Sequence, residues 1–190
     1  LWYSQPARNW TDALPIGNSR MGAMVYGGTA REELQLNEET FWAGGPYDND
    51  NKNARYVLPV VRQLIFENKN WDAQNLVDAN FFAGKHGMSY MTVGNLFLDF
   101  PGHDQATDYY RDLDISNATA TTRYKVDGVD YTRTAFASFT DSVVIMRVQA
   151  GKAGTLAFRV SYEAPLPHEV KAEGSKLSIL CQGRDQERVK

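Results

Sequence analysis

The second half of the chain is a series of short segments in which apolar and polar residues alternate, and this pattern restricts the fold most. A period of two is typical of strands with one buried face. Turn residues separate the segments and no helical pattern lies between them, which predicts antiparallel strands in a mainly β sandwich. We expect strands at residues 96–100, 110–115, 118–126, 129–138, 142–150, 155–162, 169–172 and 176–182.

Asp127-Gly128 is the strongest hairpin signal in the chain. The dipeptide lies between two of the expected strands, and it suits a two-residue type I′ turn because both central residues of that turn have positive φ angles. We therefore predict a tight hairpin at this point. A second hairpin is predicted upstream, where the segments 21–26 and 32–36 have strand character on either side of Gly27-Gly28.

Residues 53–82 differ from the rest because their apolar residues recur at helical spacing. We expect two helices there, inserted into the β domain. Pro59 is placed in a first helical turn, since proline interrupts a helix interior. Asn70 or Asp72 is expected to cap the second helix. Residues 1–190 are thus predicted to form one β-sandwich domain with a helical insertion.

Charge and residue spacing argue against several classes of partner. The net charge at pH 7 is −3, whereas nucleic-acid-binding domains carry a basic surface. No apolar run reaches the roughly 18 residues that a membrane span requires. The histidines, at positions 86, 103 and 168, do not have metal-ligand spacing, and we expect no histidine near Cys181 to activate it. We therefore predict neither a metal site nor a cofactor.

Carboxylates are the remaining candidates for catalysis, because glycoside hydrolysis uses two of them. Glu38 and Glu39 are adjacent, so their side chains point to opposite sides of an extended chain. Glu32 and Glu33 have the same arrangement, and we interpret them as exposed positions of a strand. The segment 17–22 resembles a phosphate loop only superficially, because a strand follows where a helix is needed. The residues alone therefore predict no convincing active site.

The segment 35–46, QLNEETFWAGGP, leaves a strand abruptly and combines carboxylates, two aromatic residues and a Gly-Gly-Pro turn. Large aromatic side chains on a loop are unfavourable unless the loop packs against a surface or binds a ligand. This segment is therefore the best candidate for a functional loop.

Four motifs resemble the α-L-fucosidases of glycoside hydrolase family 95. The segment 13–24, ALPIGNSRMGAM, is similar to the family's ALPIGNGRLGAMV, and 36–46, LNEETFWAGGP, is similar to LNEDTLWSGGP. Two strand motifs follow in the same order: YRDLD at 110–114 resembles YRRELDL, and YTRTAFAS at 131–138 resembles YTREVFAS. The chain departs from the family where Ser19 replaces a usual glycine and where VGNL replaces a GDL turn.

The resemblance implies an N-terminal β super-sandwich that continues beyond this chain and precedes a linker and an (α/α)6 barrel. In such enzymes the barrel hydrolyses terminal α-1,2-linked L-fucose with inversion, using a general-acid Glu and an Asp-assisted water held by Asn. No residue here matches those positions, so we expect no catalytic residue in this chain. The resemblance also implies a secreted or periplasmic protein, and α-L-galactosidase activity stays open as a variant.

We therefore predict that Asn37 to Pro46 docks on the protein's own downstream catalytic domain and edges its pocket. A fucosylated glycan would then be bound through the full-length enzyme. The candidate contact residues are Asn37, Glu38, Thr40 and Trp42.

The alternative is a free-standing carbohydrate-binding module. Sugars stack on exposed aromatic side chains, and the sequence offers several for such a platform: Trp2, Tyr3, Trp10, Trp42 and Tyr47.

Overall fold

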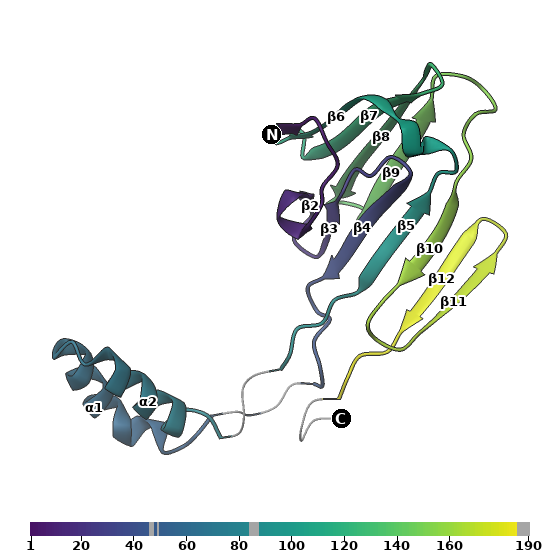
Figure 1. Ribbon diagram of the computed structural model, residues 1–190. Helices are drawn as coiled ribbons and strands as arrows, with labels where there is room; N and C mark the ends of the chain where they lie inside the picture. Colours follow the sequence, from purple (N-terminus) through teal and green to yellow (C-terminus); the bar gives the residue numbers. More distant parts are fainter. Residues whose placement is uncertain (46–47, 49, 84–87, 186–190) are drawn as a thin grey trace. The chain divides into compact units, whose positions relative to one another are not determined.

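The chain forms two compact units in the computed structural model, which describes residues 1–45, 48, 50–83 and 88–185. The first unit contains Leu1–Phe41 and Met91–Gly183, and it is built from strands. The second unit contains Trp42–Tyr90 and carries both α-helices. Figure 1 labels most elements of both units.

Two antiparallel sheets form most of the first unit (Figure 1). In the first sheet the strand order is β1-β6-β7-β8-β9, and its strands are Trp2–Tyr3, Thr107–Asp114, Thr119–Val126, Val129–Ser138 and Val143–Ala150. In the second sheet the order is β10-β5-β4-β3-β2, and its strands are Arg159–Glu163, Gly94–Asp99, Arg31–Glu38, Met21–Val25 and Leu14–Gly17. The hairpin of β11 (His168–Glu173) and β12 (Lys176–Cys181) is a separate sheet, and short 3-10 helices span Trp10–Asp12 (η1) and His103–Gln105 (η2).

Apolar side chains from both sheets meet in one core. Buried residues alternate along β2 and β8, because successive side chains of a strand point to opposite faces. The central cluster consists of Leu14, Ile16, Ala23, Val25, Leu34, Ala120 and Ala135. The predicted mainly β, antiparallel sandwich is confirmed.

Both predicted hairpins are present. Asp127 and Gly128 have φ angles of 49° and 76°, and Val126 pairs directly with Val129, as a two-residue turn with positive φ requires. The upstream hairpin joins β3 to β4, in which Val25 pairs with Leu34.

The second unit contains the two predicted helices, α1 (Ala54–Phe66) and α2 (Asn70–Asn80), which pack against each other. The expected position of Pro59 was wrong, because it lies inside α1 and beyond its first turn. Proline is tolerated there on an exposed side of the helix at the loss of one backbone hydrogen bond. The expected capping role of Asn70 or Asp72 was also wrong.

Lys69 precedes α2 in place of a capping side chain, and no side-chain cap bond forms. The turn between the helices is very short, and Asn68 takes a positive φ of 59° to reverse the chain. The amide of Lys69 bonds back to the Leu64 carbonyl at 2.8 Å. The geometry of the turn thus fixes where α2 begins.

Candidate functional site

Glu38 ends β4 and organises the start of the aromatic loop. Its Oε2 accepts hydrogen bonds from the Thr40 hydroxyl at 2.6 Å and the Thr40 amide at 2.9 Å. Arg20 Nε donates to Oε1 at 3.0 Å. These interactions, the Thr40 hydroxyl first, hold the pKa of Glu38 below its usual range. The carboxylate is therefore ionised at neutral pH and suits the stabilisation of a turn better than general-acid chemistry.

Asn37 and Glu38 also line a hollow of about 530 Å³ in the first unit. The remaining lining is almost entirely aliphatic and comes from both sheets, including Leu36, Leu96 and Val144. An aliphatic lining packs against apolar side chains but offers few groups that could orient a polar ligand. The hollow therefore provides a packing surface beside the loop.

Trp42 belongs to the second unit, where it forms a bridge pair with Tyr90. The two rings meet edge to face with centroids 4.8 Å apart, and the amide of Ala43 donates to the Ser89 carbonyl at 2.8 Å. Trp42 remains 44% exposed. The residue is therefore partly accessible to solvent.

The predicted loop residues consequently fall into two groups. Asn37, Glu38 and Thr40 lie together in the first unit, while Trp42 is held in the second. Pro46, the end of the predicted docking segment, lies outside the described residues. Contact of these residues with a downstream domain remains a prediction.

The interpretation of Glu32 as an exposed strand residue was wrong. Its side chain is fully buried, and Arg133 Nη1 lies 3.0 Å from Glu32 Oε2. Glu32 Oε1 also accepts the amides of Gly27 at 2.6 Å and Glu33 at 3.2 Å. Burial raises the pKa of Glu32, whereas the Arg133 guanidinium and these amides act in the opposite direction.

Arg133 connects this ion pair to a buried aromatic cluster. Its guanidinium donates to the carbonyls of Gly28 and Thr29 and to the Tyr124 hydroxyl, and it lies 3.9 Å from the centroid of the Phe100 ring. His103 Nδ1 lies 2.9 Å from the same Tyr124 hydroxyl. Burial and the neighbouring Arg133 lower the pKa of His103.

This cluster holds carboxylate, imidazole and phenol groups, but it serves packing. Glu32, His103 and Arg133 are all buried, so a substrate has no access to them. The ion pair and the carbonyl contacts join β4 and the segment before it to β8. A signal was present in the sequence, since Arg133 lies in register with the inward-facing residues Tyr131 and Ala135 of an alternating strand.

Arg111 plays a similar part on β6. Its Nε and Nη1 donate at 2.8 Å to the carbonyls of Gln5 and Asp12, and its guanidinium lies 4.3 Å from the centroid of the Tyr3 ring. The buried guanidinium therefore fastens the N-terminal segment to the first sheet. Tyr3 is half-buried by this contact and is not a free stacking surface.

The other aromatic residues of the predicted sugar platform lie on different elements. Trp2 is on β1, Trp10 is in η1, and Trp42 follows β4. Tyr47 lies outside the described residues. Trp2, Tyr3 and Trp10 thus lie in the first unit and Trp42 in the second, so the four described residues are divided between the two units.

The expectation that Cys181 has no histidine nearby was wrong. Antiparallel pairing of β11 and β12 places His168 directly opposite Cys181. The Tyr162 ring meets the His168 ring edge to face at 5.2 Å, and burial raises the pKa of Tyr162 to about 12. His168 Nδ1 donates to the Leu166 carbonyl at 2.9 Å. Cross-strand pairing explains the error, because it sets the first residue of β11 beside the last residue of β12 in one hairpin.

Neither a metal cluster nor a membrane span is found in the part of the chain that the structure describes. No group of three His, Cys, Asp or Glu side chains there could hold an ion. No described helix is long and apolar enough to cross a membrane. His86 lies outside the described residues.

The fold and these contacts define an antiparallel β-sandwich unit and a unit with two α-helices. In the sandwich unit the most buried ionisable groups fasten strands and loops together. The family model described as "Glycosyl hydrolase family 65, N-terminal domain" matches residues 1–188. The chain therefore belongs to this family.

Curated relatives of the chain carry fucosidase names. Alpha-L-fucosidase 2 of Arabidopsis thaliana is 39% identical over 186 residues, which cover 96% of this chain and 22% of the relative. Probable alpha-fucosidase A of Aspergillus niger is 28% identical over 195 residues, covering 96% of this chain and 24% of the relative. The chain thus spans less than a quarter of the length of these relatives, and the predicted resemblance to α-L-fucosidases is confirmed.

Proposed function

We propose that this chain is the N-terminal, non-catalytic sandwich of a glycoside hydrolase of the α-L-fucosidase type. The parent protein would release terminal α-1,2-linked L-fucose from glycans with inversion, in a downstream (α/α)6 barrel. The observation that carries the proposal is the family match over residues 1–188, together with the fucosidase names of relatives that are more than four times as long.

The ionisable groups support a non-catalytic role. Inverting hydrolysis needs two accessible carboxyl groups about 6.5–9.5 Å apart. Glu32 is buried in an ion pair with Arg133, and Glu38 accepts hydrogen bonds from Arg20 and Thr40. These residues hold the sandwich and its loop in shape, which suits a domain that supports a catalytic site elsewhere.

We further propose that Asn37, Glu38, Thr40 and Trp42 contact the downstream barrel and edge its pocket. Trp42 is the strongest candidate, because Tyr90 fixes its ring while 44% of the residue stays exposed. A pre-oriented aromatic side chain loses little freedom when it is buried at an interface, and such residues are frequent hot spots. A fucosylated glycan would bind the full-length protein, which we expect to be secreted or periplasmic.

Replacing Trp42 tests this docking role. In the full-length protein Trp42→Ala should reduce the stability of domain association by about 2 kcal/mol, the usual threshold for an interface hot spot. Thermal unfolding and the kinetics of fucose release are the measurements. Trp71→Ala is the matched control, because Trp71 is also in the second unit and is 82% exposed. Unchanged melting and kinetics in Trp42→Ala would refute the docking role.

A further inference from the structure

The outer face of the first sheet carries a hollow of about 390 Å³ between β6, β7 and β8. Its floor and rim include Tyr110, Arg123, Lys125, Asp130 and Thr132. Strand register places Arg123 beside both Tyr110 and Thr132, and Lys125 beside Asp130. A volume of this size lies within the range of small-molecule sites in proteins.

Two aromatic rings extend this hollow on the same face. Trp2 pairs with Asp112 across β1 and β6, so its side chain points to the same side as that of Tyr110, while Tyr3 points toward the interior. The Trp2 and Tyr110 rings are nearly parallel, at 17°, with centroids 6.5 Å apart. Trp2 is 69% and Tyr110 is 37% exposed. The rings therefore offer a broad aromatic surface to solvent.

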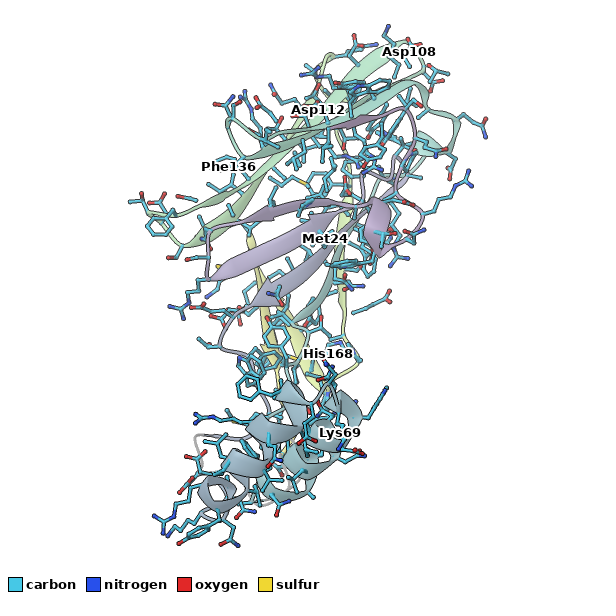
Figure 2. The ribbon with its side chains drawn as sticks, turned by 90° about the vertical axis from the view of Figure 1, so that its left-hand side faces the viewer. Met24, Lys69, Asp108, Asp112, Phe136 and His168 are labelled. Carbon is cyan, nitrogen blue, oxygen red and sulfur yellow. The ribbon has the colours of Figure 1, made fainter. Side chains whose placement is uncertain are left out.

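Charged groups stand at the other side of the hollow. Lys125 Nζ lies 3.0 Å from Asp108 Oδ2 and 3.9 Å from Asp130 Oδ1. The register between β6 and β7 shifts between Thr107 and Tyr110, and Asp108 within this irregularity has a positive φ of 51°. The irregularity turns Asp108 toward Lys125; Figure 2 labels Asp108 and Asp112 on β6.

We propose that this hollow binds a pyranose unit of a neutral glycan. A pyranose ring has an apolar face of C–H bonds, which suits the electron-rich faces of Trp2 and Tyr110. Its hydroxyls both donate and accept hydrogen bonds, as the nearby carboxylates, Arg123 and Thr132 require. An exposed aromatic pair beside a set of mixed donors and acceptors matches this amphipathic ligand.

The surface differs from the aromatic platform expected from the sequence. It shares only Trp2 with that set, and its partner ring is Tyr110 on β6, which strand pairing brings alongside. The proposal rests on the proposed function only for the choice of a fucosylated probe. A surface site of this kind would raise the local concentration of a polysaccharide near the catalytic domain.

Affinity electrophoresis of the full-length protein tests the site. Native gels would contain either a xyloglucan with terminal fucose or hydroxyethylcellulose, and the dissociation constant follows from the retardation at several polysaccharide concentrations. We expect the wild type to be retarded in at least one gel. Retardation in the first gel alone indicates recognition of side branches, and retardation in both indicates recognition of the glucan backbone.

The variants decide whether this surface is responsible. Trp2→Ala and Tyr110→Ala should each weaken binding at least about tenfold, which corresponds to about 1.4 kcal/mol. Arg123→Gln, which leaves both rings in place, should also weaken it. Trp10→Ala is the control, because Trp10 is 57% exposed but lies in η1, and it should bind like the wild type.

Two results would overturn the proposal. One is a wild type that is not retarded in either gel. The other is retardation that persists unchanged in Trp2→Ala, Tyr110→Ala and Arg123→Gln. Release of fucose from 2′-fucosyllactose by the wild type reports on the proposed function separately, so that failure of one proposal is distinguishable from failure of the other.

Discussion

Glu32 shows how partners, rather than residue type, determine where a charged side chain lies. Two ions leave water when this residue and Arg133 are buried, and several kcal/mol per ion are lost in doing so. The pair persists because both oxygens of the Glu32 carboxylate have donors. Arg133 lies against Oε2, and the amides of Gly27 and Glu33 donate to Oε1. Removal of one partner of the ion pair should therefore lower the stability of the folded protein far more than removal of both.

Substitution of Glu32 tests this at the residue scale. Glu32→Gln should lower the free energy of unfolding by about 3–5 kcal/mol, because it leaves the Arg133 charge buried without a counter-ion. Denaturant titration of the full-length protein, monitored by tryptophan fluorescence, is the measurement. Glu163→Gln is the control: its exposed pair with Arg31, at 2.9 Å, should contribute no more than about 1 kcal/mol. Equal losses in the two variants would contradict the structural role of Glu32.

His103 makes the stability of the sandwich depend on pH. Burial lowers its pKa in the folded protein, whereas in the unfolded chain it titrates near 6.5. Below about pH 6.5 the unfolded state therefore binds the extra proton first, and stability falls as the pH falls toward the folded-state pKa. Above that window this histidine adds no pH dependence.

His103→Gln should remove this contribution. We expect the loss of unfolding free energy between pH 7 and pH 5 to be smaller in the variant than in the wild type, by at most about 2 kcal/mol, the value for a histidine that stays neutral in the folded protein. Denaturant titrations at the two pH values provide the comparison. His168→Gln, a change at an exposed histidine of β11, should keep the wild-type loss. The account of His103 is wrong if both variants lose stability as the wild type does.

At the scale of elements, turns carry much of the local information. The β2–β3 turn depends on Asn18, whose Oδ1 accepts the amides of Arg20 at 3.2 Å and Met21 at 2.7 Å. Asn18 Nδ2 also donates to the Ser138 carbonyl at 2.6 Å and so ties this turn to the end of β8. Ser19 completes the turn with a positive φ of 77°, which is unfavourable for a residue with a Cβ atom.

Ser19→Gly should therefore stabilise the protein by about 0.5–1 kcal/mol, since glycine adopts this conformation without strain, although it costs more entropy on folding. The melting temperature of the full-length protein reports the change. Ser116→Gly, in a turn without a positive φ at that residue, should be neutral or destabilising. A lower melting temperature for Ser19→Gly would contradict this, because it would show that the serine side chain stabilises the turn by more than its positive φ costs.

The sequence predicted these elements where local chemistry determines them. Alternation of apolar and polar residues predicted β6 to β9, and Asp127-Gly128 predicted the two-residue turn between β7 and β8. Alternation did not reveal β1 and β2 as strands, because their conformation depends on pairing with β6 and β3. Alternation also predicted an exposed Glu32. Its buried counter-ion, Arg133, lies on another strand and becomes its neighbour only in the tertiary fold.

At the scale of the molecule, strand order is the information that the sequence did not supply. Pairing of β1 with β6, and of β10 with β5, joins segments far apart in the chain. The pairing of β1 with β6 also creates the Trp2–Tyr110 surface. The family assignment, in contrast, followed from long motifs such as ALPIGNSRMGAM, which are also local features.

We propose above all that this chain supports an α-L-fucosidase without performing the chemistry itself. The most direct measurement is proton NMR of 2′-fucosyllactose during incubation with the full-length parent protein and, separately, with residues 1–190. We predict that the parent releases fucose first as the inverted β anomer and that residues 1–190 release none. Fucose release by residues 1–190 alone, or no release by the parent protein, would contradict the account.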